Sequence, residues 1–142
     1  MASALRAAAT VSVVAILAAG CGGGSKKSEG GETQGKMTQI AGVSANDHGS
    51  KTVGGKAEVE LDDYYFEPTV LKGKPGAKVT LELKNEGKEE HNLSIDDQSI
   101  DQDVEAGETK TVTVTIPQSG EVSFYCKYHK SKGMAGALEA SG

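Results

Sequence analysis

Residues 121–140, EVSFYCKYHKSKGMAGALEA, combine a strand pattern with side chains that can bind a metal ion. Val122 and Phe124 alternate with other residues up to Cys126, and apolar residues at period two are typical of a half-buried strand. We expect this strand to end at Cys126. After an intervening loop, we expect residues 137–139 to form a further strand that closes the sheet.

The same alternation recurs upstream, in segments that turn signals separate. KVTLELK (78–84) and TVTVTIP (111–117) carry aliphatic residues at every second position, as do Val59 and Leu61. The turn signals occur at residues 73–76, 85–87, 106–108 and 117–120. No long apolar stripe at helical spacing appears after residue 53. The pattern therefore predicts an all-β domain over residues 54–142, an antiparallel sandwich or Greek-key barrel.

The side chains best suited to bind a soft metal are few and close together in the domain sequence. From residue 54 onward there are two histidines, one cysteine and one methionine, namely His91, Cys126, His129 and Met134. One thiolate, two imidazoles and a weak thioether are the donor set of type 1 copper sites. Thiolates favour Cu(I) and imidazoles suit both oxidation states, so little rearrangement accompanies electron transfer. The set predicts one copper ion, cycling between Cu(I) and Cu(II).

Each of these residues also has an ordinary structural explanation. A lone cysteine at a strand end is usually a small core residue, a methionine beside glycine can fill a gap, and either histidine can lie on the surface. Taken separately, these explanations do not account for the presence of all four residues at this spacing. A Cys/His hydrolase would need a base held by a third group and an oxyanion hole, and no such set is recognisable.

The spacing resembles that of the cupredoxin family, and of plastocyanin-type single-domain members above all. The family's C-x2-H-x4-M loop is matched by Cys126, His129 and Met134, and its upstream His-Asn pair by His91-Asn92. FEPTVLKGKPGAKVTLELKNEG (66–87) is similar to the N-terminal half of the family domain. The resemblance covers about residues 58–140.

This resemblance implies a Greek-key β-sandwich with copper near one end. It implies that Cys126, His91 and His129 are the strong ligands and Met134 the weak axial one. The Asn92 side chain is expected to steady the ligands through hydrogen bonds. Plastocyanins commonly have proline just before the second histidine, where this chain has Tyr128, so we expect differences in loop rigidity and potential.

The charge distribution suggests how such a domain would meet its partners. The chain has a formal net charge of −5, which argues against binding nucleic-acid phosphates. Between residues 82 and 108 there are ten carboxylates and two lysines, whereas the 126–134 loop carries three lysines and no acid. We expect Lys127, Lys130 and Lys132 to steer an acidic redox partner and to raise the copper potential, with Tyr125 at a second docking area.

The N-terminal sequence is typical of an exported lipoprotein. Residues 1–20 place Arg6 before an apolar stretch and a small-residue cleavage region, and Cys21 then resembles the lipidated cysteine of a bacterial lipobox. A transmembrane anchor, or ordinary cleavage and secretion, are the alternatives. Residues 21–53 are rich in Gly, Ser and Lys, which predicts a disordered, flexible linker with His48 as a solvated residue.

Together these features predict an extracytoplasmic, membrane-anchored electron carrier with a monomeric domain. Its partners would be redox proteins, such as c-type cytochromes or copper oxidases and reductases. A site with three strong ligands and one axial ligand leaves no open position for substrate, so we do not expect an enzyme. The alternatives are a copper-delivery protein and an accessory module of a larger oxidase. Three methionines in the whole chain favour the carrier over delivery.

Overall fold

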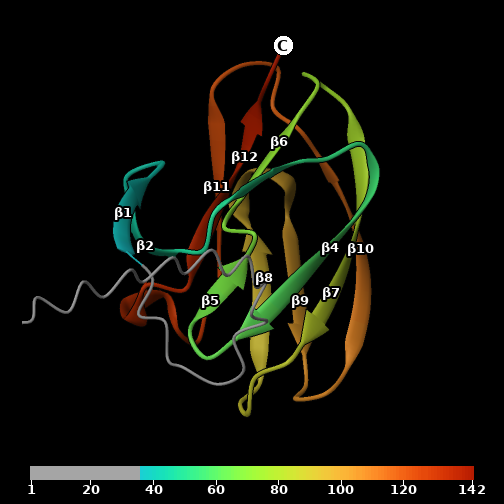
Figure 1. The fold of residues 1–142 in the computed structure, drawn as a ribbon. Helices are drawn as coiled ribbons and strands as arrows, with labels where there is room; N and C mark the ends of the chain where they lie inside the picture. The colour runs from blue at the N-terminus through green and yellow to red at the C-terminus, as the bar shows by residue number, and fades with distance from the viewer. Residues whose placement is uncertain (1–35) are drawn as a thin grey trace, which may run out of the picture. The chain divides into compact units, whose positions relative to one another are not determined.

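The computed structural model of the protein describes residues 36–142, which fold almost entirely into β-strands (Figure 1). Short 3₁₀ turns lie at Asp96–Gln98 (η1) and Lys130–Lys132 (η2). The strands are β1 (Lys36–Ile40), β2 (Val43–Asp47), β3 (Ser50–Thr52), β4 (Gly55–Asp62), β5 (Tyr65–Glu67), β6 (Val70–Gly73), β7 (Lys78–Asn85), β8 (His91–Ile95), β9 (Ile100–Val104), β10 (Thr109–Thr115), β11 (Glu121–Tyr125) and β12 (Ala135–Ala140). No helix among these described residues is long and apolar enough to cross a bilayer.

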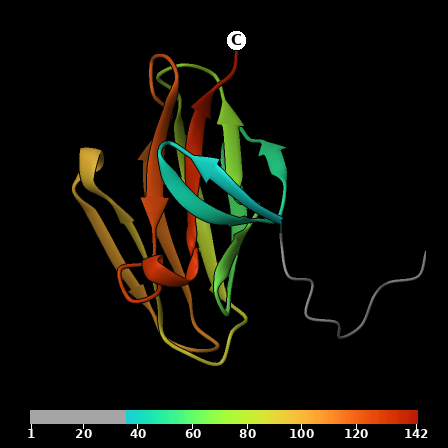
Figure 2. The same cartoon turned by 90° about the vertical axis from the view of Figure 1, so that its left-hand side faces the viewer.

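The strands form two larger sheets and a separate hairpin. One sheet has four strands in the order β10-β7-β4-β5, and the other has six in the order β3-β6-β12-β11-β8-β9. The hairpin consists of β1 and β2 (Figures 1 and 2). Most neighbouring strands are antiparallel, but β4 pairs with β7, and β6 with β3 and β12, in parallel. This arrangement confirms the expected all-β sandwich.

The hydrophobic core lies between the two sheets. Leu61 of β4 faces it from the four-stranded sheet, Leu93 of β8 from the six-stranded sheet, and both are fully buried. Phe66 of β5 meets Phe124 of β11 edge to face, with ring centroids 5.0 Å apart. This geometry is favourable for two aromatic rings, so the pair helps to hold the two sheets together. The pair lies near the end of β11, which Cys126 directly follows.

The burial pattern of β8 differs from that of the long strands β4 and β7. Burial alternates along β4 and β7, as the period-two sequences predict. In β8, which lies between β11 and β9, all five residues are buried. A strand covered on both faces does not alternate, so β8 forms an inner wall of the sandwich at the point where His91 begins it.

The structure corrects the predicted extent of the linker. We predicted flexible chain over residues 21–53, but residues 36–52 contain β1, β2 and β3. Residues 21–35 lie outside the described residues, as do the predicted signal and Cys21. The three early strands are short and polar, so they carry almost no period-two signal in the sequence.

These strands are ordered by the domain they join. β3 pairs in parallel with β6 along Ser50–Thr52, which extends the six-stranded sheet. In the hairpin, the buried residues Ile40 and Ala45 pack against Ala135 and Ala137 of β12. The folded domain therefore begins well before residue 54, and its N-terminal strands depend on partners twenty or more residues away in the sequence.

Candidate metal centre

Three of the side chains predicted to bind metal converge in the structure. One possible ligand atom from each of His91, Cys126 and His129 lies within 4.8 Å of the other two, and all three residues are buried. The Nδ1 atoms of the two histidines are 3.2 Å apart, and Cys126 Sγ lies 3.6 Å from His129 Nδ1. Among the residues that the structure describes, this is the only such group of three or more His, Cys, Asp or Glu side chains.

Backbone hydrogen bonds fold the 126–134 loop around this group. The His129 N–H donates to the Cys126 carbonyl at 3.1 Å, and the Cys126 N–H donates to the Met134 carbonyl at 3.0 Å. Gly133 ends η2 with φ of 85°, a left-handed conformation that glycine adopts without steric cost. The loop lies at the end of the sandwich opposite the C-terminus (Figures 1 and 2).

Met134 is fully buried at the entry to β12 and belongs to the same core cluster as Cys126. Its N–H donates to the His129 carbonyl at 3.2 Å, which fixes its backbone beside the other loop ligand. This backbone position is compatible with the expected axial role, which remains a prediction.

The Cys126 sulfur is surrounded by backbone donors. The N–H groups of Tyr128, His129 and Asn92 are directed at it, and hydrogen bonds to sulfur favour the thiolate. Burial has the larger effect, however, so the pKa of the metal-free thiol is raised. Because a metal ligates the thiolate, binding would release this proton.

Asn92 links the wall strand to the ligand loop. Its side-chain oxygen accepts the Lys127 N–H at 3.3 Å and the Ser94 hydroxyl at 2.5 Å. Its amide donates to Asp101 at 2.7 Å and to Asp103 at 2.9 Å. These contacts place Asn92 where a residue that steadies the site is needed, directly after His91 and against the residue that follows Cys126.

Two carboxylates that the sequence did not single out contact the imidazoles. Asp63 Oδ1 lies 3.0 Å from His91 Nε2, and Glu89 Oε2 lies 2.8 Å from His129 Nε2. Burial lowers the pKa of His91, although Asp63 opposes this change. Burial alone would raise the pKa of Asp63, but hydrogen bonds from the Lys88 N–H and from His91 outweigh it, so that pKa is lowered.

The three loop lysines occupy different surroundings. Lys127 Nζ lies 2.8 Å from Asp101 and 2.9 Å from Asp103, and the hydrogen bonds to these carboxylates raise the pKa of Lys127. Lys130 and Lys132 lie above tyrosine rings, with Nζ 4.1 Å from the centroid of Tyr125 and 3.9 Å from that of Tyr64, respectively. Acidic side chains therefore offset part of the positive charge that the loop sequence displays.

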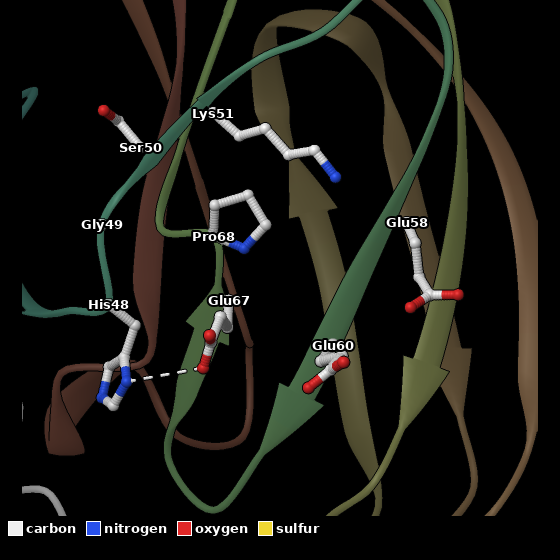
Figure 3. Close-up of a pocket in the computed structure, with 8 residues that line it drawn as sticks. All are labelled: His48, Gly49, Ser50, Lys51, Glu58, Glu60, Glu67 and Pro68. Carbon is white, nitrogen blue, oxygen red and sulfur yellow. Dashed lines mark ion pairs between the residues drawn. The ribbon is translucent and has the colours of Figure 1, made fainter. Parts of the chain in front are cut away.

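The third histidine of the chain lies outside the metal cluster, and the structure corrects its predicted environment. His48 stacks on Tyr65 with ring centroids 3.5 Å apart, and its Nδ1 lies 3.8 Å from Glu67. It lines a shallow hollow beside Glu58, Glu60 and Glu67 (Figure 3). His48 is thus a packed surface residue of the folded domain and not a solvated linker residue.

The converging residues fit a single copper ion. Two neutral imidazoles and one thiolate, held together in a buried cluster, are the donors that a type 1 copper ion requires. Each imidazole nitrogen that faces the cluster is Nδ1, because Nε2 faces a carboxylate. The types and the burial of these three donors thus agree with the copper predicted from the sequence.

Comparison with known proteins supports this assignment of the fold. The chain is similar to auracyanin of the photosynthetic bacterium Roseiflexus castenholzii, at 17% identity over 61% of this chain and 97% of that chain, with a TM-score of 0.52. It is also similar to auracyanin A, a "blue" copper protein of Chloroflexus aurantiacus, at 20% identity over 64% and 100% of the two chains, with a TM-score of 0.52.

A third similar structure is that of a heme-copper terminal oxidase dimer, at 14% identity over 61% of this chain and 65% of that chain, with a TM-score of 0.52. No curated protein sequence matches the chain. A family model described as a cupredoxin-like domain matches residues 37–138, which include the N-terminal hairpin and all four residues of the predicted donor set. The sandwich, the buried His-Cys-His group and this match together show that the chain belongs to the cupredoxin-like family.

Proposed function

We propose that the protein is an extracytoplasmic type 1 copper protein that carries single electrons between redox partners and catalyses no reaction itself. The observation that carries this proposal is the convergence of the buried side chains of His91, Cys126 and His129 in a cupredoxin-like domain. The similarity to auracyanins, one of them described as a "blue" copper protein, supports it.

In this proposal, Cys126, His91 and His129 hold the ion, and Met134 is the weak axial ligand. Bound copper supplies a centre that accepts and releases one electron between Cu(II) and Cu(I). The protein keeps the ligands in one arrangement for both states, since β8 is buried throughout and Asn92 ties it to the loop. A pocket that does not rearrange keeps the barrier to electron transfer low.

The electron would enter and leave through the edge of His129. This ring is 8% exposed, whereas His91 and Cys126 are completely buried, and the adjacent Tyr128 is 47% exposed. A redox protein, such as a c-type cytochrome or a copper oxidase or reductase, would dock over this edge. Lys127, Lys130, Lys132 and Tyr125 would contribute to the docking surface.

The first experiment adds Cu(II) to the purified full chain. We expect one copper per chain and an intense visible absorption from thiolate-to-copper charge transfer, together with a reversible one-electron wave in voltammetry. Cys126→Ser should abolish the absorption, whereas Cys21→Ala, which removes the other cysteine, should preserve it. A colourless wild-type complex would contradict the proposal.

Copper delivery is the second candidate, because the same donors would bind copper in a protein that hands it on. A delivery site needs ligands that exchange readily, and the burial of His91 and Cys126 disfavours such exchange. Copper loss to a strong chelator separates the two functions. A carrier should retain copper over many redox cycles, whereas rapid and complete transfer would favour delivery.

The cellular location is a further part of the proposal. Export through residues 1–20 and lipidation of Cys21 would hold the domain near membrane-bound donors and acceptors. We expect the protein in the membrane fraction and Cys21→Ala in the soluble extracytoplasmic fraction. Mass spectrometry of the N-terminal peptide would detect the lipid directly. Recovery of the unmodified Cys21 peptide from mature protein would contradict anchoring by lipid.

A further inference from the structure

The two histidines of the metal centre each contact a carboxylate on the side of the ring that faces away from the cluster. For His91 this partner is Asp63, with Oδ1 3.0 Å from Nε2, and for His129 it is Glu89, with Oε2 2.8 Å from Nε2. A carboxylate accepts the Nε2–H of a neutral imidazole, which leaves Nδ1 without a proton and free to bind a metal. The carboxylates therefore favour the tautomer that the copper site needs.

Asp63 is held in place by the chain around it. It lies directly after β4, and its two carboxylate oxygens accept the Lys88 N–H at 3.2 and 3.3 Å. Gly87 packs against the Asp63–His91 pair so closely that an added Cβ would lie 2.5 Å from Asp63 Oδ1 and 2.6 Å from His91 Nε2. A side chain at position 87 would therefore crowd both groups, and the chain has glycine there.

The two carboxylates differ in their access to water. The Asp63 side chain is 25% exposed and faces a histidine that is completely buried. The Glu89 side chain is 48% exposed and faces the histidine at the surface. Water and salt screen the charge of an exposed group more strongly, so Asp63 should have the larger electrostatic effect on the centre.

We propose that Asp63 is a positioning residue that fixes His91 as the Nε2–H tautomer and lowers the reduction potential of the bound copper. This inference rests on the proposed function. A negative charge on the far side of a ligand imidazole makes the ring more basic and stabilises Cu(II) relative to Cu(I). On reduction, one electron would pass from the redox partner to the copper while the proton stays on Nε2, so no proton would be taken up or released.

The test compares Asp63→Asn with the full-length wild type by voltammetry. The substitution keeps the size of the side chain and removes its charge. We expect the ratio of Cu(II) to Cu(I) affinity to fall about tenfold, which corresponds to a potential raised by about 59 mV. The matched control, Glu89→Gln, removes the exposed carboxylate and should change this ratio less than about threefold. An unchanged potential in Asp63→Asn would overturn the inference.

A measurement without copper tests the same inference in the unsubstituted chain. Nitrogen NMR of the metal-free wild type should show His91 protonated at Nε2, and protonation at Nδ1 would overturn the proposal even if Asp63→Asn failed to fold. Gly87→Ala, which keeps every charge but crowds the pair, should disturb the His91 signals more than those of His129. The visible absorption of the copper-loaded wild type distinguishes failure of this inference from failure of the proposed function. A blue wild type with an unchanged Asp63→Asn potential refutes only the role of Asp63, whereas a colourless wild type refutes the proposed function.

Discussion

Strand β8 and the 126–134 loop supply the same metal cluster but are built in opposite ways. Every residue of β8 is buried, and His91 and Asn92 have no exposed surface. The loop turns His129 and Met134 inward while it presents Tyr128 and its lysines to solvent. One half of the centre is an interior wall, and the other half is part of the protein surface.

The bonds that hold the two regions differ accordingly. β8 pairs with β9 along its whole length and with β11 at Ser94, so its position follows from the sheet. The loop depends on single contacts, such as the Lys127 N–H to Asn92 and the Asn46 N–H to the Gly133 carbonyl at 2.9 Å. We infer that the wall fixes the geometry of the centre and that the loop controls access to it. The following predictions test this division.

The largest expected effect follows from removing one imidazole from each region. His91→Gly and His129→Gly should each lower copper affinity more than about 100-fold and abolish the intense absorption. Free imidazole should restore the absorption in His129→Gly, where the vacated space adjoins solvent, but not in His91→Gly, where the wall encloses it. Titration with imidazole, followed by visible absorption, measures this. Equal rescue of both variants would show that the wall is no less accessible than the loop.

The ligand loop was the part of the centre most readily predicted from the sequence. Cysteine, histidine and methionine are rare in this chain, so their spacing around Cys126 carries much information. The long strands were also predictable, because residues such as Val79, Leu81 and Leu83 face one core and therefore recur at period two.

The contacts that support the centre could not be predicted in this way. Asp63 and Glu89 are two of twenty acidic residues in the chain, and only the folded chain brings them to the imidazoles. The early strands were missed because they gain their order from distant partners. The ion pairs of Lys127 could not be predicted either, since Asp101 and Asp103 lie far from it in the sequence and contact it only in the folded chain.

A smaller effect is expected from crowding the sheet where the loop returns to it. In Gly136→Ala the new methyl group would collide with the Thr69 carbonyl oxygen and would lie 2.5 Å from the Phe124 ring. We expect the free energy of unfolding to fall by about 3 kcal/mol, as measured by denaturant titration. Gly54→Ala is the control, because its Cβ would meet no atom within 4 Å and its φ is not positive. Equal stability of the two variants would contradict the tight packing of this sheet.

A still smaller effect should result from freeing the loop from the N-terminal hairpin. The Asn46 side chain donates to the carbonyls of Tyr64 and Lys132, each at 3.0 Å. Asn46→Ala should lower the free energy of unfolding by about 1 kcal/mol. It should also speed copper loss to a chelator, because the loop loses its hydrogen bond from the hairpin side chain while the contacts of β8 are unchanged. Gln39→Ala, which removes an exposed hydrogen bond to Ser44 within the same hairpin, should change neither quantity. If both variants released copper at the wild-type rate, the hairpin would have no role in holding the loop.

The smallest effects should come from the loop lysines, whose side chains are exposed to solvent. Lys130→Ala and Lys132→Ala should each slow electron transfer to hexacyanoferrate(III) about twofold to threefold at low ionic strength. The same substitutions should accelerate electron transfer to a cationic cobalt complex. Both changes should vanish at about 1 M salt, where ions screen exposed charges beyond about 3 Å.

The modest size of this effect has a structural cause. Glu89 contacts His129, and Asp101 and Asp103 contact Lys127, so an approaching anion meets both signs of charge around the exposed ring. Stopped-flow rates with the two oxidants distinguish a long-range electrostatic effect of the lysines from a specific contact between a lysine and the oxidant. Loss of the long-range electrostatic effect changes the two electron-transfer rates in opposite directions. Loss of a specific contact slows electron transfer to one oxidant, and it does so in high salt as well. Rates that are unchanged in both lysine variants would remove Lys130 and Lys132 from the docking surface and leave the exposed Tyr128 beside His129 as its centre.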